Sequence, residues 1–172
     1  MSIPKIETPH LILRAWTPSD ANSLFEILQE TDMFKYFPQT KPPQRPWVDK
    51  YIHHHLTHWD ARGYGHWAVI NQKDGQVIGW TGLEYLPETD ETEVAYLLSR
   101  TVWGRGFATE AACAAVRFGK ETYRLPVIIG LVHPENIASI KVLEKCGLVF
   151  NNRATYWGLE MLRYLTPSVE TK

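Results

Sequence analysis

The stretch EVAYLLSRTVWGRGFATEA, residues 93–111, carries the most informative pattern in this sequence of 172 residues. An apolar run that favours a strand leads into Gly104 and Gly106, which flank Arg105, and good helix formers follow. Glycines let the main chain approach a ligand closely, and the N-terminus of a helix stabilises an anion through its free N–H groups. The pattern predicts a phosphate-binding turn, with an ordinary tight turn before a helix as the alternative.

Two common phosphate-binding loops do not fit this stretch. A Walker loop ends in Gly-Lys-Ser/Thr, and neither glycine of this turn is followed by that ending. A dinucleotide-binding fingerprint needs a third glycine where this chain has Thr109, and no strand–helix–strand unit precedes the turn. A nucleotide-binding enzyme is therefore disfavoured.

Hydrophobic periodicity and turn signals predict the elements on both sides of this stretch. We expect a proline-rich loop over 37–46 and helices that begin at 17–20 and cover 47–62, 106–120 and 136–147. The expected strands are 10–16, 66–71, 76–86, 91–99, 126–132, 148–156 and 158–165. This order predicts a mixed sheet with helices on its faces, in a single domain over residues 1–172.

Composition narrows the classes of partner. Hydrophobic residues make up 44% of the chain, charged residues 22%, and the net charge is −1. Such a chain lacks the basic field that nucleic acids require, and no apolar run is long enough to span a membrane. Without an apolar signal core at the N-terminus, we expect a cytoplasmic monomer or homodimer in which Cys113 and Cys146 are reduced core thiols.

Together with VHPENIASIKVLEKCGLVF, residues 132–150, the stretch 93–111 resembles the GNAT superfamily of acetyl-CoA-dependent N-acetyltransferases. The similarity covers roughly residues 8–165, in order and spacing, and is greatest to the branch that acetylates N-terminal amines of ribosomal proteins. It implies an α/β fold with a mixed, mostly antiparallel central sheet of about seven strands, helices on both faces and a splayed pair of parallel strands. It also implies transfer of acetyl from acetyl-CoA directly to a primary amine, of a protein N-terminus or a small molecule. A non-catalytic acyl-CoA-binding sensor or interaction module is the alternative.

The resemblance implies that the glycine turn holds the pyrophosphate of coenzyme A. The residues it assigns to this role are Gly104, Arg105, Gly106, Phe107, Ala108 and Thr109. Trp103 stands where the family usually has Gln or Arg, and the sequence offers no role for it. The resemblance further implies that the free main chain of Tyr96, Leu97 and Leu98 holds the pantetheine and the acetyl carbonyl, although core packing also explains these residues.

The expected proton donor is missing from its usual place. Many family members have a tyrosine four residues before the glycine that ends the last helix, and this chain has Leu143 there. Asn136 and Ser139 match the branch pattern, so Asn136 could bind the pantetheine amide and Ser139 could approach the coenzyme sulfur. A plain N-cap and a hydroxyl bonded to its own backbone are the alternatives.

The candidate general base is Glu93, which matches a glutamate often found in the branch; Glu84 is the second choice. Solvated charges at a strand end are the alternative for both. The expected walls of the acceptor site are aromatic. They are Tyr36 and Phe37 in the proline-rich loop, and Tyr156 and Trp157 in the last hairpin.

His54 and His58 lie four apart on the second expected helix, a spacing that can supply two metal ligands. The nearby acids of this helix, Asp49 and Asp60, lie neither three nor four positions from either histidine. We therefore expect no metal site and no metal cofactor.

Overall fold

The computed structural model describes residues 2–167 of the chain. Its main helices and strands run in the following order: β1 (Ile6–Glu7), β2 (Leu11–Arg14), α1 (Ala21–Leu28), α2 (Arg45–Arg62), β3 (His66–Asn71), β4 (Val77–Leu86), β5 (Glu91–Leu98), α3 (Phe107–Arg117), β6 (Ile129–Val132), α4 (Ile137–Lys145), β7 (Val149–Tyr156) and β8 (Leu159–Leu165).

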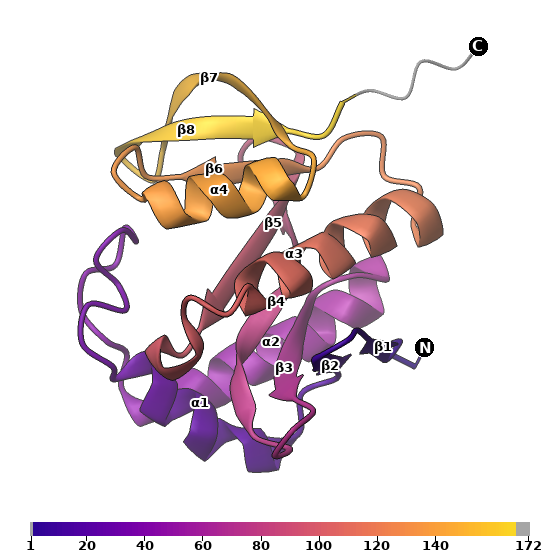
Figure 1. Cartoon of the computed structure of the whole chain (residues 1–172), viewed down its shortest axis with the longest axis vertical. Coiled ribbons are helices and arrows are strands. Elements are labelled where there is room, and N and C mark those ends of the chain that lie inside the picture. The colour runs from indigo at the N-terminus through magenta and orange to yellow at the C-terminus, as the bar shows by residue number, and fades with distance from the viewer. Residues whose placement is uncertain (1, 168–172) are drawn as a thin grey trace.

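The strands form one sheet in the order β1-β2-β3-β4-β5-β6-β8-β7 (Figure 1). All neighbours pair antiparallel except β5 and β6, which are parallel. The mixed, mostly antiparallel sheet is therefore confirmed. The strand that the sequence did not predict is β1, whose two residues are too few to show an alternating pattern.

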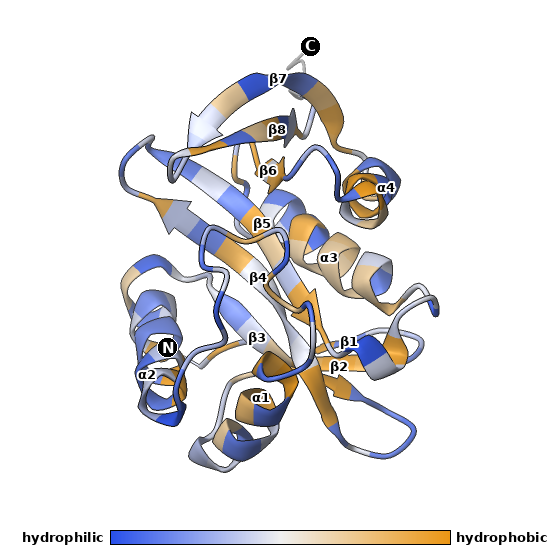
Figure 2. Cartoon of the chain, turned by 90° about the vertical axis from the view of Figure 1, so that its left-hand side faces the viewer, coloured by the Kyte–Doolittle hydropathy of each residue, from blue (hydrophilic) through white to orange (hydrophobic). Residues whose placement is uncertain are grey.

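Helices cover both faces of the sheet, with α1 and α2 on one face and α3 and α4 on the other (Figure 2). The alternation of β5 explains why both faces are apolar, because successive side chains point to opposite sides. Leu97 packs into the cluster formed with α1 and α2, whereas Val94 and Leu98 pack into the cluster formed with α3 and α4. No helix within residues 2–167 is long and apolar enough to cross a membrane.

Helix boundaries follow the local signals closely. Helix α2 begins with Pro46 in its first turn and stops at Gly63, whose φ of 73° only glycine adopts readily and whose N–H donates to the Trp59 carbonyl at 2.8 Å. Helix α4 is capped by Asn136, whose side-chain oxygen accepts from the Ser139 N–H at 3.2 Å. Both boundaries lie within two residues of those that the sequence predicted.

The expectation of two reduced thiols is wrong. Cys113 of α3 and Cys146, at the C-terminal cap of α4, form a disulfide, with their Cα atoms 4.8 Å apart. The two helices pack side by side on one face of the sheet, and this contact brings together cysteines that are 33 residues apart in the sequence. The inference of a reducing compartment from free thiols therefore loses its basis.

Helix α4 lies close to the sheet because β6 has a glycine beneath it. A Cβ added at Gly130 would lie 2.5 Å from Cδ2 of Leu143, which is 1% exposed. Leu143, which occupies the usual place of the family's tyrosine, therefore fills the core between α4 and β6.

We expect Gly130→Ala to lower the free energy of unfolding by about 1–3 kcal/mol, because the added methyl group overpacks this contact. In a Leu143→Ala background the same substitution should cost less, since the space that it needs is then open. Urea unfolding of the four variants measures this coupling. Equal costs in both backgrounds would show that the contact with Leu143 does not limit the approach of α4.

Candidate active site

Strands β5 and β6 separate almost at once. The one residue pair recorded between them in the described chain is Glu93 with Ile129. On its other side β5 pairs with β4 along its whole length, from Glu91 to Leu98. The β5 edge that faces β6 beyond Glu93 therefore offers main-chain N–H and C=O groups without a ladder partner. This splayed pair is the feature that the sequence resemblance implied, and Tyr96, Leu97 and Leu98 lie along it.

The glycine turn after β5 has the conformation of an anion site. Gly104 and Gly106 have φ values of 77° and 78°, and Gly106 is the N-cap of α3. The positive φ values favour glycine at both positions, and an added Cβ would meet no atom within 4 Å, so the space above the turn is open. The first N–H groups of α3, at Phe107, Ala108 and Thr109, point out of a helix end that no side chain caps.

Trp103 connects this turn to β5. Its indole Nε1–H donates to the Leu98 carbonyl at 2.9 Å, and its ring, 55% exposed, lies under the Arg100 guanidinium with 5.3 Å between that group and the ring centroid. The residue that the sequence could not explain therefore holds the start of the turn against the end of the splayed strand.

Helix α1 holds the same region from the opposite side. The Glu30 carboxylate, just beyond the end of α1, accepts hydrogen bonds from Ser99 Oγ and from the Arg100 N–H, each at 2.6 Å. Charge-assisted bonds of this kind fix the short 3₁₀ turn Arg100–Val102 from which the glycine turn starts.

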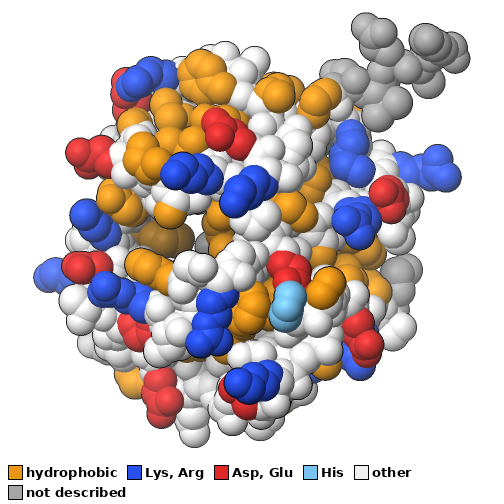
Figure 3. Space-filling view, viewed as in Figure 1, with side chains coloured by type: hydrophobic (Ala, Val, Ile, Leu, Met, Phe, Trp, Pro, Cys, Tyr) orange, Lys and Arg blue, Asp and Glu red, His pale blue; other side chains and the backbone are white. Residues whose placement is uncertain are grey.

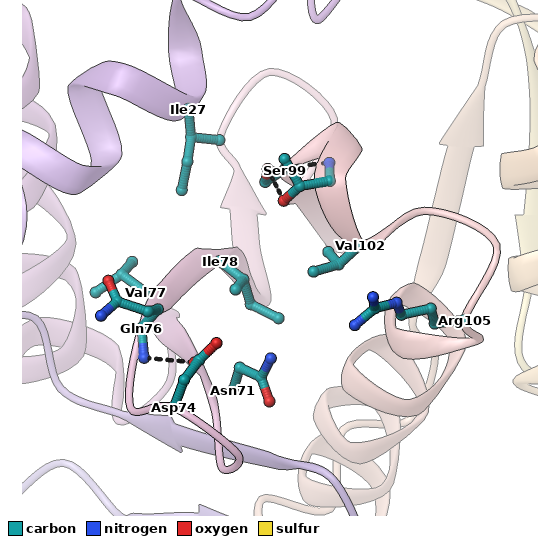
Figure 4. A pocket seen from close by; sticks show the side chains of 10 residues that line it. Ile27, Asn71, Asp74, Gln76, Val77, Ile78, Ser99, Val102 and Arg105 are labelled. Carbon is teal, nitrogen blue, oxygen red and sulfur yellow. Dashed lines mark hydrogen bonds between the residues drawn. The ribbon is translucent and has the colours of Figure 1, made fainter.

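Arg105 extends away from the glycine turn. Its side chain lines a cavity of about 310 Å³ between α1, the β3–β4 hairpin and the turn Arg100–Val102 (Figure 4). Asn71, Asp74 and Gln76 make the rim of this cavity polar. The contribution of Arg105 to phosphate binding stays a prediction.

On the α4 side of the gap, Tyr96 and Ser139 meet. Tyr96 Oη lies 2.6 Å from Ser139 Oγ and donates to the Ser139 carbonyl at 3.2 Å. Burial raises the pKa of Tyr96 above its ordinary value, so the phenol stays protonated. The sequence assigned only main-chain groups of Tyr96, because its hydroxyl partner lies 43 residues away.

Asn136 and Ser139 differ in the hydrogen bonds that their side chains make. The Asn136 oxygen is taken by the helix cap, as the alternative interpretation expected, whereas Ser139 Oγ is bonded to Tyr96 and not to its own backbone. Ser139 therefore lies at the gap with a hydroxyl that is part of a two-residue network.

On the opposite face of the sheet, Glu93 stands beside Glu84. They are direct cross-strand partners, and Glu93 is 9% exposed, so the expectation of a solvated charge is wrong for it. Burial, and then the neighbouring charge of Glu84, raise the pKa of Glu93 to about 8. Burial also raises the pKa of Glu84, which lies 3.8 Å from His54 Nε2 and 3.6 Å from His66 Nε2.

The aromatic residues proposed as acceptor walls stand at the two sides of this region. Tyr36 lies 5.3 Å from the His133 ring, between centroids, and Tyr156 Oη donates to Glu91 at 2.7 Å. Arg163 also donates to Glu91, at 2.5 Å, so this carboxylate is already paired. Figure 3 shows apolar side chains at the bottom of a hollow just below α4.

Comparison with known proteins matches residues 10–149 to the family model described as an acetyltransferase (GNAT) domain. The protein YkkB of Bacillus subtilis is 28% identical over 93% of this chain and 94% of its own length. An N-acetyltransferase named p20, from Bacillus licheniformis, is 30% identical over 79% of this chain and 77% of its own.

Solved structures agree on the fold. The acetyltransferase from Agrobacterium tumefaciens superimposes with a TM-score of 0.85 at 28% identity, over 98% of this chain and 96% of that chain. RimL, a ribosomal L7/L12 α-N-protein acetyltransferase solved in complex with coenzyme A, has a TM-score of 0.81 at 15% identity, over 98% of this chain and 100% of that chain. At the lower identity the likeness establishes the fold alone.

The bond from Trp103 to Leu98 gives a specific test of the turn. We expect Trp103→Phe to lower the free energy of unfolding by about 1 kcal/mol, because the buried carbonyl loses its donor while the aromatic ring remains. Amide hydrogen exchange at Gly104 and Gly106 should become faster. The matched control is Trp47→Phe, since Trp47 is also exposed, at 40%, and lies on α2. Unchanged exchange at both glycines would contradict the anchoring role.

Proposed function

This chain belongs to the GNAT family of acetyltransferases, and we propose that it transfers an acetyl group from acetyl-CoA directly to a primary amine. We assign this activity to a single domain over residues 1–172. The observation that carries the proposal is the separation of β5 from β6 after one residue pair, next to a helix N-terminus capped by Gly106. An unpaired strand edge and an anion site would then lie in line. An extended ligand needs this arrangement if it carries an amide-containing arm at one end and a pyrophosphate at the other.

The residues present fit coenzyme A at each end of this path. The N–H groups at the start of α3 would bind the pyrophosphate, over two glycines that leave the space above them open. The main-chain groups of Tyr96 and the N–H of Leu98 would bind the pantetheine, since Leu97 pairs with Trp80 of β4 and the Leu98 carbonyl is bonded to the Trp103 indole. Asn136 would add its remaining amide N–H groups. A strand N–H without a ladder partner would donate to the acetyl oxygen as negative charge develops on it.

Glu93 is our candidate for the group that accepts the proton of the attacking amine. It lies at the point where β5 and β6 part, and we place the thioester beside its carboxylate. The amine nitrogen forms a bond to the acetyl carbon, the carbon–sulfur bond breaks, and Glu93 takes the proton from nitrogen directly or through a water. Beside it, Glu84 adds negative charge that favours a cationic amine.

Ser139 is our candidate donor to the leaving sulfur, with Tyr96 behind it. The hydroxyls of these residues lie 2.6 Å apart, so Tyr96 would orient Ser139 to donate a hydrogen bond to the departing thiolate, and neither hydroxyl loses its proton. A thiol with an ordinary pKa of about 8.5 needs little help to leave. This network takes the place of the tyrosine that Leu143 replaces, and the transfer as proposed assigns no step to a metal.

The acceptor would approach from the face that carries α1 and α2, because Glu93 and Glu84 lie on that face. The two carboxylates favour a cationic amine, and Tyr36 and Tyr156 would supply aromatic walls for the acceptor. The two classes of acceptor to test are a peptide N-terminus and a small-molecule amine.

The activity is tested by mixing the protein and acetyl-CoA with peptides that start with Ala or Ser, free amino acids, polyamines and aminoglycosides. We expect thiol release that depends on one class of amine. Binding of acetyl-CoA without release for any amine would favour an acyl-CoA sensor, and no binding would contradict both functions.

For the binding site, we expect Gly106→Glu to abolish acetyl-CoA binding in calorimetry, because it places a negative side chain in the open space above the turn. Gly75→Glu is the matched control, since Gly75 also has a positive φ, of 71°, and no atom within 4 Å of an added Cβ. If the Gly106 variant binds as well as the control, the glycine turn is not the phosphate site.

For the base, we expect Glu93→Gln to lower kcat of amine-dependent thiol release at least about 100-fold, with the Kd for acetyl-CoA unchanged. The amide keeps the size of the side chain but accepts a proton poorly. Glu88→Gln, an exposed position in the same hairpin, serves as the control. A Glu93→Gln enzyme with the kcat of the control would remove Glu93 from the mechanism.

A further inference from the structure

A histidine cluster lies where α2 crosses β3 and β4, on the face of the sheet opposite α3 and α4. It consists of His54, His55 and His58 of α2 and His66 of β3, with Glu84 of β4 beside them. The proposed acetyl transfer uses none of the four imidazoles, and it uses Glu84 only as a nearby negative charge, which a bound cation would offset.

Three of these side chains converge on one point. His54, His55 and Glu84 each offer one ligand atom, and these atoms lie within 4.8 Å of one another. His54 Nε2 lies 3.8 Å from Glu84 Oε1. Glu84 lies on β4, 30 residues after His54, so the spacing of residues along α2 does not reveal it.

Buried nitrogens of this cluster have no partner. Nδ1 of His55, Nε2 of His58 and Nε2 of His66 are buried without a hydrogen bond to any residue in the described part of the chain. His55 and His66 are each 2% exposed. An unsatisfied buried polar atom costs free energy. Of the three, Nδ1 of His55 belongs to the converging side chains, and it indicates a ligand that the protein alone does not supply.

Packing fixes the rings next to this point. The His66 ring stacks between the rings of His55 and Trp80, with centroids 3.9 Å and 4.5 Å away. Tyr51 Oη lies 2.9 Å from His66 Nδ1 and holds the orientation of that ring. His66 is not one of the converging side chains, but its stack against His55 holds the His55 ring in place, much as outer contacts orient the histidines of metal sites.

We propose that His54, His55 and Glu84 bind a divalent transition-metal ion of the Zn²⁺ class. Two imidazoles and one carboxylate suit Zn²⁺ and leave a fourth position for water or another ligand. The donors of a tetrahedral zinc site lie roughly 3.3 Å apart, so the side chains must close on the ion. His54 and Glu84 can do so, since their side chains are 61% and 32% exposed, while packing holds His55 in place.

To test this, protein without an oligohistidine tag is titrated with Zn²⁺ and the binding is measured by calorimetry. Acetyl-CoA and amine are absent from the solution. We expect one ion per chain and a higher Tm with Zn²⁺ than without. Co²⁺ in place of Zn²⁺ should give the visible absorption of a four-coordinate site with nitrogen and oxygen ligands. These readouts are independent of acetyl transfer, so failure of one proposal leaves the other standing.

Variants locate the ion. His54→Ala and Glu84→Gln should each weaken Zn²⁺ binding at least about tenfold and remove the Tm increase, because each loses a ligand. His53→Ala is the matched control, an exposed histidine of the same helix outside the cluster. Binding as tight in His54→Ala as in the unmodified chain, or an equal loss in His53→Ala, would overturn the proposal.

Discussion

The parting of β5 from β6 after Glu93 and Ile129 is the constraint on which the rest of this structure depends. A sheet interrupted at its centre leaves main-chain groups unpaired where the protein is otherwise densely packed, and such groups need partners. The two halves stay together through other contacts. Helix α3 packs on the strands of one half and also against α4, which covers the other, and the Cys113–Cys146 disulfide links these two helices. The gap is thus held open by elements on both sides of it.

Around the gap, the chain places different chemistry on the two faces of the sheet. Tyr96 and Ser139 form a pair of neutral hydroxyls on the α4 face, whereas Glu93 and Glu84 bring two carboxylates to the α2 face. The alternation of β5 is the cause, since Glu93 and Tyr96 are three positions apart and point to opposite sides. The hydroxyl pair and the carboxylates therefore lie a few residues apart on opposite faces of the sheet.

The sequence predicted what local signals control. Gly63 ends α2 and Asn136 caps α4 because both effects act within a few residues, and the order of strands and helices followed from periodicity. The sequence did not predict contacts that depend on which elements become neighbours. The bond from Trp103 to Leu98, the contact of Tyr96 with Ser139 and the Cys113–Cys146 disulfide required the packed structure. The resemblance of residues 93–111 and 132–150 to a family, and not periodicity, supplied the splayed strands.

The two faces also come from different parts of the chain. Helices α1 and α2, residues 21–62, lie over the carboxylates, whereas α3 and α4, residues 107–145, carry the glycine turn and Ser139. Substitutions in the first third of the sequence can therefore change one wall of the gap while the other keeps its shape. On the assignment proposed above, such a division would let natural variation or engineering alter acceptor preference as a nearly independent trait, within a scaffold whose donor side is inherited intact.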